Sequence, residues 1–449
     1  MTKTLIKGGT IISMDEKIGL LEKGDVLIED DEILEVKTEI NAGDAEIIEA
    51  SEMIVMPGLI DSHVHTWQTG IRGIAGNWTM GQYLRGMHAN LATSFKPEDI
   101  YLGNLAGALT HINGGITCFL DWSHNNPTPD HTDGAIDGLK ESGVRAIFGH
   151  GSPKPDPKEG QKHFSEVPHP EHEIKRLRNG RLSSDQDLIT LGMCILGPHY
   201  STYEVTHHDI LLARKYDLLA SMHMSGGFNR LVPDGIYKMR DDKLLDSKLN
   251  IVHGNDLSDE ELAILIDHGV KITTTPEVEI QMGFGDPITG RVIALGGRPS
   301  IGVDVESNIS GDMFNVMRMA LQVQRMIDNR PFADAHKPIE NLSISPIQAL
   351  EWATINGAHM MGMEHQIGSL SIGKQADIIL VRTNDLNIRP VNDPINALVF
   401  YANASNVDTV YIAGKAVKRK GKLAYNGLSN VMKKLEKSRQ RILANVHDA

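Results

Sequence analysis

Short apolar runs separated by turn residues divide the chain into two kinds of region. Near the N-terminus, β-like runs such as Asp25–Ile28 lie between glycine-containing or acidic turn clusters, which indicates a small antiparallel sheet. Similar runs return near the C-terminus, at Ala376–Val381 and Val407–Ala413. We therefore expect both chain ends, residues 1–56 and 366–449, to build one small β-sandwich domain.

The middle of the chain, residues 57–365, alternates strand-like and helix-like segments. The clearest helices are Glu98–Leu109 and Asp259–Asp267, and the second has Ser258 as its cap with Glu261 three residues further on. The apolar runs between the helical segments have the length of buried strands: Leu59–Val64, Gly115–Leu120, Val144–Phe148, Ile189–Leu196, Leu218–Met222, Asn250–Val252, Val270–Thr274 and Ser300–Val303. Such alternation is typical of βα units around a parallel sheet.

These eight runs predict an α/β fold, a TIM-like (β/α)₈ barrel, for the middle region. A doubly wound open sheet would need a glycine-rich dinucleotide loop after an early strand, and the sequence has none. In a barrel, the chemically active residues lie just past the C-terminal ends of the strands. Polar side chains follow the proposed strands at these positions: His63, His65, Asp121, His150, His199, His223, His253, Glu277, Glu279 and Asp304.

The first of these strands ends in two histidines with one residue between them. Side chains two residues apart in a strand point to the same face, so His63 and His65 would present two imidazoles side by side. Neutral imidazole is the commonest metal ligand in proteins. The pair therefore indicates a metal site at the mouth of the barrel.

Composition narrows the class of protein. The 449 residues carry 44 basic and 58 acidic side chains, a net charge of −14, without a basic block. This argues against a nucleic acid partner, because phosphate binding requires a basic face. Cys118 and Cys194 lie far apart in apolar surroundings, as reduced core thiols do. With no signal peptide and no run long enough to span a membrane, we expect a cytoplasmic protein without a membrane partner.

An ordered set of motifs resembles the amidohydrolase superfamily, in the branch that holds triazine hydrolases and cytosine, guanine and adenosine-type deaminases. The resemblance covers nearly the whole chain, and the ordered set is more specific than any one motif. Its parts are Pro57–His65, Arg72–Gly73, Gly114–Thr117 before Asp121, Gly197–His199, His223, His253 before Leu257–Glu261, Gly302–Asp304, Ala353–Ala358 and Ile367–Asp377.

The resemblance implies one divalent metal, Zn²⁺ before Fe²⁺, Mn²⁺ or Co²⁺, held by His63, His65, His223 and Asp304. Asp304 would also move the proton of a metal-activated water, and His253 would polarise the substrate or steady the attacking hydroxide. His199 resembles the substrate-contacting histidine of the family. The absence of a lysine near the fourth strand argues against the binuclear branch with a carboxylated lysine.

One departure from the family pattern affects the expected reaction. In the deaminases of this branch, a glutamate lies three residues after the fifth-strand histidine and protonates a ring nitrogen. Here Gly226 occupies that place after His223. Glu277 or Glu279 could replace the acid, although solvated loop carboxylates are an equally good interpretation. Trp67 could supply an apolar wall for a flat substrate, or it could be packing.

The sequence thus favours a metal-dependent hydrolase that cleaves a C–N or similar bond in a small amide, carbamate, urea or N-heteroaromatic substrate. The first alternative is a purine, pyrimidine or triazine deaminase with a relocated acid. The second is a catalytically silent homologue, which the survival of all four ligands disfavours. By resemblance alone, we expect a homodimer or a higher homo-oligomer.

Overall fold

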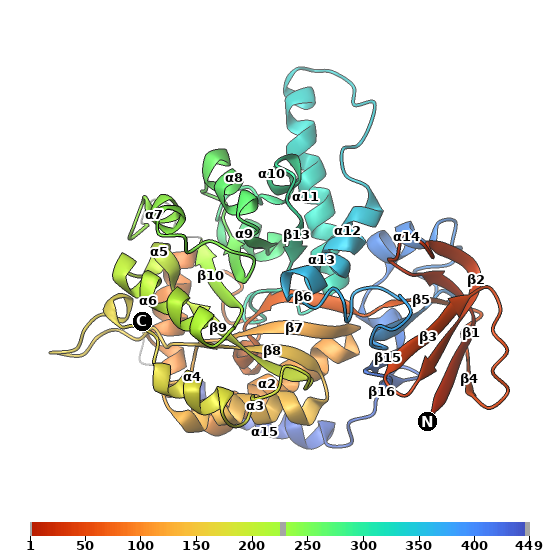
Figure 1. Cartoon of the computed structure of the whole chain (residues 1–449), viewed down its shortest axis with the longest axis horizontal. Helices are drawn as coiled ribbons and strands as arrows, with labels where there is room; N and C mark the ends of the chain where they lie inside the picture. Colours follow the sequence, from red (N-terminus) through yellow and green to blue (C-terminus); the bar gives the residue numbers. More distant parts are fainter. Residues whose placement is uncertain (1, 225–229, 445–449) are drawn as a thin grey trace.

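A parallel barrel forms the centre of the molecule. The computed structural model describes residues 2–224 and 230–444, and within these ranges eight parallel strands follow one another around the barrel, from β6 to β13 (Figure 1). The strands are β6 (Leu59–Val64), β7 (Ile116–Ser123), β8 (Arg145–Gly151), β9 (Ile189–Ile195), β10 (Ala220–Met224), β11 (Leu249–His253), β12 (Lys271–Thr274) and β13 (Pro299–Ile301). Each strand overlaps a predicted run, so the predicted barrel is confirmed.

The barrel closes between its first and last strands through a short seam. Val64 and Asp304 form an isolated parallel bridge. The amide of Asp304 donates to the carbonyl of His63 at 2.7 Å, and the amide of His65 donates to the carbonyl of Asp304 at 2.8 Å. At Gly302, a Cβ atom would lie 2.7 Å from the His63 carbonyl oxygen, so only glycine fits this close approach.

Helices pack around the outside of the barrel. The helices after successive strands are α2 (Pro97–Asn113), α3 (Pro129–Ser142), α4 (Glu171–Arg178), α6 (Tyr203–Lys215), α7 (Gly235–Asp241), α8 (Asp259–Asp267), α10 (Thr289–Ala294), α11 (Met313–Asp334), α12 (Pro346–Trp352) and α13 (Ile355–Met360). The predicted bounds of α8 are confirmed. Ser258 and Glu261 form the reciprocal capping box that the sequence predicts.

Short helical turns lie at the C-terminal mouth of the barrel. They are η1 (Thr66–Ile71), α1 (Met80–Tyr83), η2 (Leu84–His88), η3 (Leu91–Ser94), α5 (Gly197–Tyr200) and α9 (Pro276–Met282). Two segments project from the body in Figure 1, the loop between β8 and α4 and the end of α11 with the chain that leads to α12.

A second sheet combines the two ends of the chain, as predicted. In the described residues it has nine strands: β1 (Lys3–Ile12), β2 (Leu20–Glu29), β3 (Glu32–Lys37), β4 (Glu46–Glu49), β5 (Met53–Pro57), β14 (Ile378–Arg382), β15 (Val407–Ile412), β16 (Lys415–Arg419) and β17 (Lys422–Leu423). Most pairs are antiparallel, but β1 pairs in parallel with β4 and β5. Its core includes Ile6, Val26, Val55 and Ile378.

The last helix, α15 (Leu428–Ala444), contacts α2 and η1 of the barrel. Its buried side chains are Val431, Ser438 and Ile442, and the rest of its surface is largely polar. The C-terminal segment therefore crosses back from the small sheet to the barrel, and the predicted domain boundaries stay a prediction. In the part of the chain that the structure describes, no helix is both long enough and apolar enough to cross a bilayer.

Candidate metal centre

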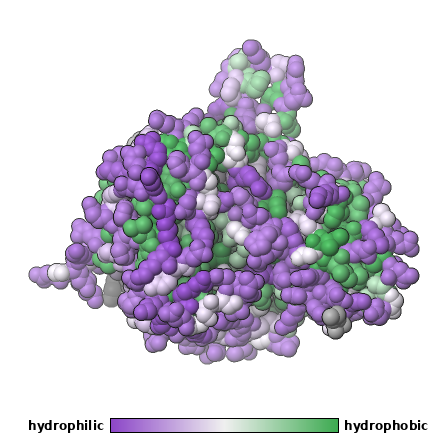
Figure 2. All heavy atoms as spheres, viewed as in Figure 1, coloured by the Kyte–Doolittle hydropathy of each residue, from purple (hydrophilic) through white to green (hydrophobic). Residues whose placement is uncertain are grey.

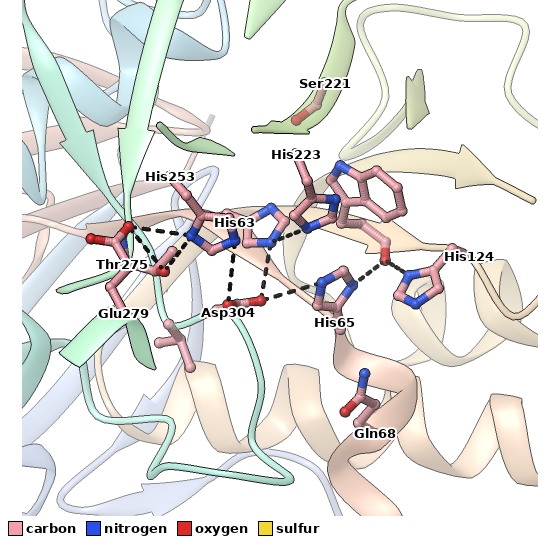
Figure 3. A network of polar contacts seen from close by, with 12 residues as sticks. His63, His65, Gln68, His124, Ser221, His223, His253, Thr275, Glu279 and Asp304 are labelled. Atoms are coloured by element: carbon pink, nitrogen blue, oxygen red, sulfur yellow. Dashed lines mark hydrogen bonds and ion pairs between the residues drawn. The ribbon is translucent and has the colours of Figure 1, made fainter. Parts of the chain in front are cut away.

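Three histidines and an aspartate converge at the mouth of the barrel. His63 on β6, His223 on β10, His253 at the end of β11 and Asp304 after β13 each offer one ligand atom, and these atoms all lie within 4.8 Å of one another. All four side chains are buried. Figure 3 shows the Asp304 carboxylate facing the imidazoles of His63 and His253. The barrel thus brings together residues that are up to 241 positions apart in the sequence.

His65 completes the group that the sequence predicted. Its Nε2 lies 3.3 Å from Asp304 Oδ1. Its Nδ1 donates to the carbonyl oxygen of Trp122 at 2.7 Å, which leaves the lone pair on Nε2 (Figure 3). A backbone acceptor behind a ligating histidine is the arrangement that fixes the tautomer required for metal binding.

The electrostatics of the cluster fit a divalent cation. Burial lowers the pKa of His63 to about 3 and that of His223 well below its ordinary value, so both imidazoles are neutral. Burial alone would raise the pKa of Asp304, but its contacts with the imidazoles of His63 and His65 hold the pKa below its ordinary value. Buried lone pairs and one carboxylate therefore converge, with Nε2 of His63 only 3.2 Å from Nε2 of His223. This donor set suits Zn²⁺ or a similar ion.

His253 is oriented by a carboxylate behind it. Its Nδ1 lies 3.2 Å from Glu279 Oε1 and 3.1 Å from Thr275 Oγ1. Glu279 also accepts from the amide of Thr275 at 2.8 Å and from Asn255 Nδ2 at 3.2 Å. The opposite nitrogen, Nε2, lies 3.8 Å from Asp304 Oδ2. Glu279 therefore holds the imidazole of His253 with Nε2 directed at the other proposed metal-binding residues.

Two residues of the cluster have an unusual backbone conformation. His253 has a φ of 72° and Asp304 a φ of 69°, in the left-handed region that side chains other than glycine rarely adopt. Such conformations persist where the surrounding structure imposes them, and they concentrate at functional sites. Here the strain coincides with the two residues that the sequence analysis predicts to be catalytic, Asp304 for proton transfer and His253 for polarising the substrate or steadying the hydroxide.

A cavity of about 30 Å³ lies directly over the cluster. This volume suffices for an ion or about one water molecule but not for an organic substrate. Its walls are formed by His65, Met80, Tyr83, Leu84, His88, His124, Lys154, Tyr200, His223, His253, Met282, Phe284, Asp304 and Val305. A substrate therefore has to displace side chains of this wall when it enters.

Three residues predicted to contact substrate lie outside this lining. Trp67 is fully buried in η1 and packs edge-on against Phe95. Glu279 is fully buried behind His253. His199 is buried in α5, where burial lowers its pKa to about 4, while the next residue, Tyr200, reaches the cavity. Substrate contact by these three side chains stays a prediction.

Other polar residues near the strand ends have structural partners. Asp121 lies within β7 and accepts from Thr66 and Asn104. His150 lies within β8, and its Nδ1 is 2.9 Å from Nε2 of His169. The ring of His169, in the long loop after β8, is buried against His150. Glu277 is half-buried and accepts from Asn315 rather than facing the cluster. Gly226 lies outside the described residues.

The sequence analysis missed three polar side chains that reach the cavity, His88, His124 and Lys154. His88 and His124 contact each other with ring centroids 4.6 Å apart, and the ring of His124 is 4.5 Å from that of His65. Lys154 belongs to the Pro153–Pro155 segment of the long loop after β8. The prolines on either side of Lys154 were the local sequence signal for its placement, because they favour an extended backbone in this segment.

A family model and curated relatives match most of the chain. A family model described as "Amidohydrolase family" matches residues 54–417. A 5-methylthioadenosine/S-adenosylhomocysteine deaminase from Bacillus cereus is 28% identical over 433 residues, which cover 92% of this chain and 94% of the relative. A 5'-deoxyadenosine deaminase from Methanobrevibacter smithii is 27% identical over 449 residues, with 93% of each chain covered.

Solved structures share the fold over nearly the full length. An adenosine deaminase from Xanthomonas campestris with bound zinc has a TM-score of 0.83 at 20% identity, with 99% of both chains covered. An atrazine chlorohydrolase from Arthrobacter aurescens complexed with zinc has a TM-score of 0.85 at 21% identity, covering 97% of this chain and 100% of that one.

Proposed function

This chain belongs to the amidohydrolase family, and we propose that its metal centre hydrolyses a C–N bond in a small amide, carbamate, urea or N-heteroaromatic compound. The observation that carries the proposal is the convergence of buried, neutral imidazoles and an ionised carboxylate at the barrel mouth. The family match confirms the enzyme class that the sequence predicted, a hydrolase of the amidohydrolase type.

The residues present fit one divalent cation. We infer that it is Zn²⁺, held by His63, His65, His223 and Asp304, since nitrogen donors with one carboxylate suit this ion best. Fe²⁺, Mn²⁺ and Co²⁺ are alternatives with similar ligand preferences. When bound, such an ion acts as a Lewis acid that lowers the pKa of water toward neutrality.

Two side chains are placed to move protons. The carboxylate of Asp304 is ionised, so it accepts a proton from the water that adds to the substrate. His253 presents Nε2 to the same space and has Glu279 behind Nδ1, so a proton taken up on Nε2 would be stabilised by the carboxylate. Water is otherwise excluded by the small, buried cavity.

Deamination of an adenosine-type nucleoside is the second candidate. It is favoured by the deaminases from Bacillus cereus and Methanobrevibacter smithii, which align along almost the whole chain. Gly226 argues for a different proton donor, since it stands where the deaminases of this branch have a glutamate. Release of ammonia from an adenosine-type nucleoside therefore distinguishes the second candidate from the first.

The test is a substrate panel run on the metal-loaded protein. Amides, carbamates, ureas, halogenated triazines, nucleobases and adenosine-type nucleosides are offered to wild type, Asp304→Asn and Gly226→Glu, with bound metal quantified in each. Turnover by wild type that is lost in Asp304→Asn supports the proposed hydrolase, and ammonia release from nucleosides selects the second candidate. Absence of both metal and turnover would instead indicate a silent homologue.

We also infer that the chain forms a homodimer or a higher homo-oligomer. The projecting end of α11 and the chain leading to α12 expose the apolar side chains of Met326, Phe332, Ile339 and Leu342. In Figure 2 hydrophobic residues are visible among hydrophilic ones on this projection. Light scattering after size exclusion would measure the mass, and a monomer at micromolar concentration would contradict the inference. The cytoplasmic location stays a prediction, consistent with the buried free thiols of Cys118 and Cys194.

A further inference from the structure

The loop after β8 places one positively charged side chain, Lys154, in the small cavity over the proposed metal site. Pro153 and Pro155 line an outer cavity of about 620 Å³. Lys154, which lies between them, lines instead the small cavity over the proposed metal-binding residues. The segment Pro153–Pro155 is therefore the wall between an outer space large enough for a substrate and the reactive centre. Of the described residues that line the small cavity, Lys154 is the only lysine or arginine.

The ammonium of Lys154 is held by aromatic rings instead of by an acid. Nζ lies 5.2 Å from the centroid of the Trp122 ring and 5.5 Å from that of Tyr200. No carboxylate of a described residue lies within 4.0 Å of Nζ. Aromatic faces stabilise a cation but accept its N–H groups only weakly. The ammonium therefore keeps strong hydrogen-bond donors available for a ligand in the cavity.

Trp122 links this ammonium to the metal ligands. The indole ring that Lys154 covers also lies 4.3 Å from the ring of His223 and 5.5 Å from that of His65, measured between centroids. Lys154 also lines the same cavity as His65, His223 and Asp304. A substrate whose reacting carbon lies at these residues would therefore extend into the space that Lys154 lines.

We propose that Lys154 is a catalytic residue that donates its proton to the leaving nitrogen of the substrate. This inference rests on the proposed hydrolysis of a C–N bond. It supplies the acid that the sequence lacks at Gly226, from a different strand and a different loop. Of the two candidate acids from the sequence, fully buried Glu279 is occupied by His253, Thr275 and Asn255, and Glu277 accepts from Asn315.

The proton balance of the reaction is complete without a further reactant. Water adds its oxygen to the substrate carbon, the C–N bond breaks, and the leaving nitrogen keeps the electron pair and takes a proton from Lys154 Nζ. The added water gives one proton to Asp304 or His253, and this proton returns to Lys154 after the products leave and water re-enters the cavity. The products are the oxygenated carbon compound and ammonia or an amine, with no change in oxidation state.

The acidity of the group agrees with this role. Burial lowers the pKa of Lys154 to about 8, while the negative charge of Asp304 opposes the shift. At neutral pH the amine is mostly protonated, yet it releases its proton far more readily than an exposed lysine. The other titratable groups around it or along the same cavity are His65, Tyr83, His88, His124, Tyr200, His223 and His253.

The first experiment compares leaving groups. Lys154→Met removes both the charge and the transferable proton. Lys154→Arg keeps the charge, but the guanidinium is too weak an acid to donate a proton. Lys158→Met is the control, because Lys158 lies on the exposed part of the same loop. On a panel substrate with an amine leaving group, we expect Lys154→Met and Lys154→Arg to lower kcat by about 10²–10⁴-fold. On the matched compound with a chloride leaving group, which needs no proton, the loss should be less than about 10-fold. Equal losses on both compounds, or recovery of kcat in Lys154→Arg, would overturn the proposal.

The second experiment observes the amine directly. Reductive methylation with ¹³C-formaldehyde gives each lysine an NMR signal, and the signal absent from Lys154→Arg belongs to Lys154. A titration midpoint near pH 8 supports the assignment, whereas a midpoint near the ordinary 10.5 overturns it. This readout needs no turnover. If the wild type hydrolyses no compound in the panel, the proposed function is refuted. The titration still measures the pKa of Lys154 independently of that result.

Discussion

At the scale of single residues, the centre is set by which nitrogen of each histidine carries a proton. His65 donates from Nδ1 to the carbonyl of Trp122, and His253 has its Nδ1 against Glu279. In both rings the opposite nitrogen is directed toward Asp304. The acceptors behind the rings therefore prepare them for metal binding and for proton uptake.

The carboxylate behind His253 gives the first prediction. Glu279→Gln keeps the size of the side chain but removes the negative charge that stabilises a protonated His253. We expect kcat to fall by about 10–100-fold, the usual effect of removing such a supporting partner, with the bound metal retained. Steady-state kinetics together with metal analysis measures both quantities.

Glu277→Gln is the matched control, because Glu277 lies on the same helix and contacts Asn315 instead of His253. If the two variants had the same kcat, the carboxylate of Glu279 would have no special part in the reaction.

The sequence located the residues whose position follows from strand geometry. His63, His223, His253 and Asp304 could be predicted because each lies at the end of an apolar run, and the barrel brings strand ends together. Lys154 could not, since its placement depends on the path of a long loop that no periodicity describes.

Burial was harder to predict than position. The rings of Trp67 and His169 occur in polar, loop-like stretches, yet both are enclosed by contacts between segments distant in sequence. His169 is held under β8 by its bond to His150, a pairing that the sequence alone does not reveal.

At the scale of secondary structure elements, the closing strands give the second prediction. Gly302→Ala would bring a Cβ to 2.7 Å from the His63 carbonyl oxygen, and backbone cannot yield as a flexible side chain does. We expect a loss of unfolding free energy of about 1–3 kcal/mol together with weakened metal binding, measured by urea titration and metal analysis.

Gly43→Ala is the control, since a Cβ there meets no atom within 4 Å and its φ is not positive. An unchanged stability and metal content in Gly302→Ala would show that the two strands have room to separate.

The lengths of the strands could not be predicted accurately from the hydrophobic pattern. β7 and β8 run past their predicted ends, because Asp121 and His150 lie inside the strands and find polar partners there. An apolar criterion ends a strand at the first polar residue, although a buried polar residue with a partner is compatible with the interior.

The pairing of β8 with the following loop gives the third prediction, a dependence of stability on pH. Burial lowers the pKa of His150 to about 3 and that of His169 well below its ordinary value. Above pH 6.5 the histidines are neutral in both folded and unfolded chains. As the pH falls below 6.5, the unfolded chain binds protons that the folded chain excludes, so the unfolding free energy falls by up to about 1.4 kcal/mol per pH unit for each histidine.

Urea titrations between pH 7.5 and 5 measure this slope. In the double variant His150→Gln/His169→Gln the slope should become shallower, whatever the effect on stability at pH 7.5. Exposed His172→Gln serves as the comparison, and its slope should match wild type. An unaltered slope in the double variant would mean that these rings protonate in the folded protein.

At the scale of the whole molecule, metal binding and folding are coupled, which gives the fourth prediction. The proposed ligands lie on or just after the first, fifth and last strands of the barrel, so a bound ion would connect distant parts of the sheet. A metal present at about 100 times its Kd adds about 2.7 kcal/mol to the unfolding free energy. Chelation should therefore lower Tm, and added Zn²⁺ should restore it, as measured by calorimetry.

Asp304→Asn provides the control for this experiment, because the Tm of a variant with a weakened site should respond little to chelator. Identical melting of metal-loaded and chelated wild type would mean that the ion binds folded and unfolded chains alike.

The seam of the barrel and the reactive centre occupy the same few residues. The last backbone bridge joins Val64, which follows the proposed metal ligand His63, to Asp304, which is itself a proposed ligand. Selection for a closed barrel and selection for catalysis therefore act together on this stretch. In a mutational scan, we expect a narrow band of intolerance along the seam. In a homologue that has lost catalysis, these positions would still be constrained, because the barrel closes through them.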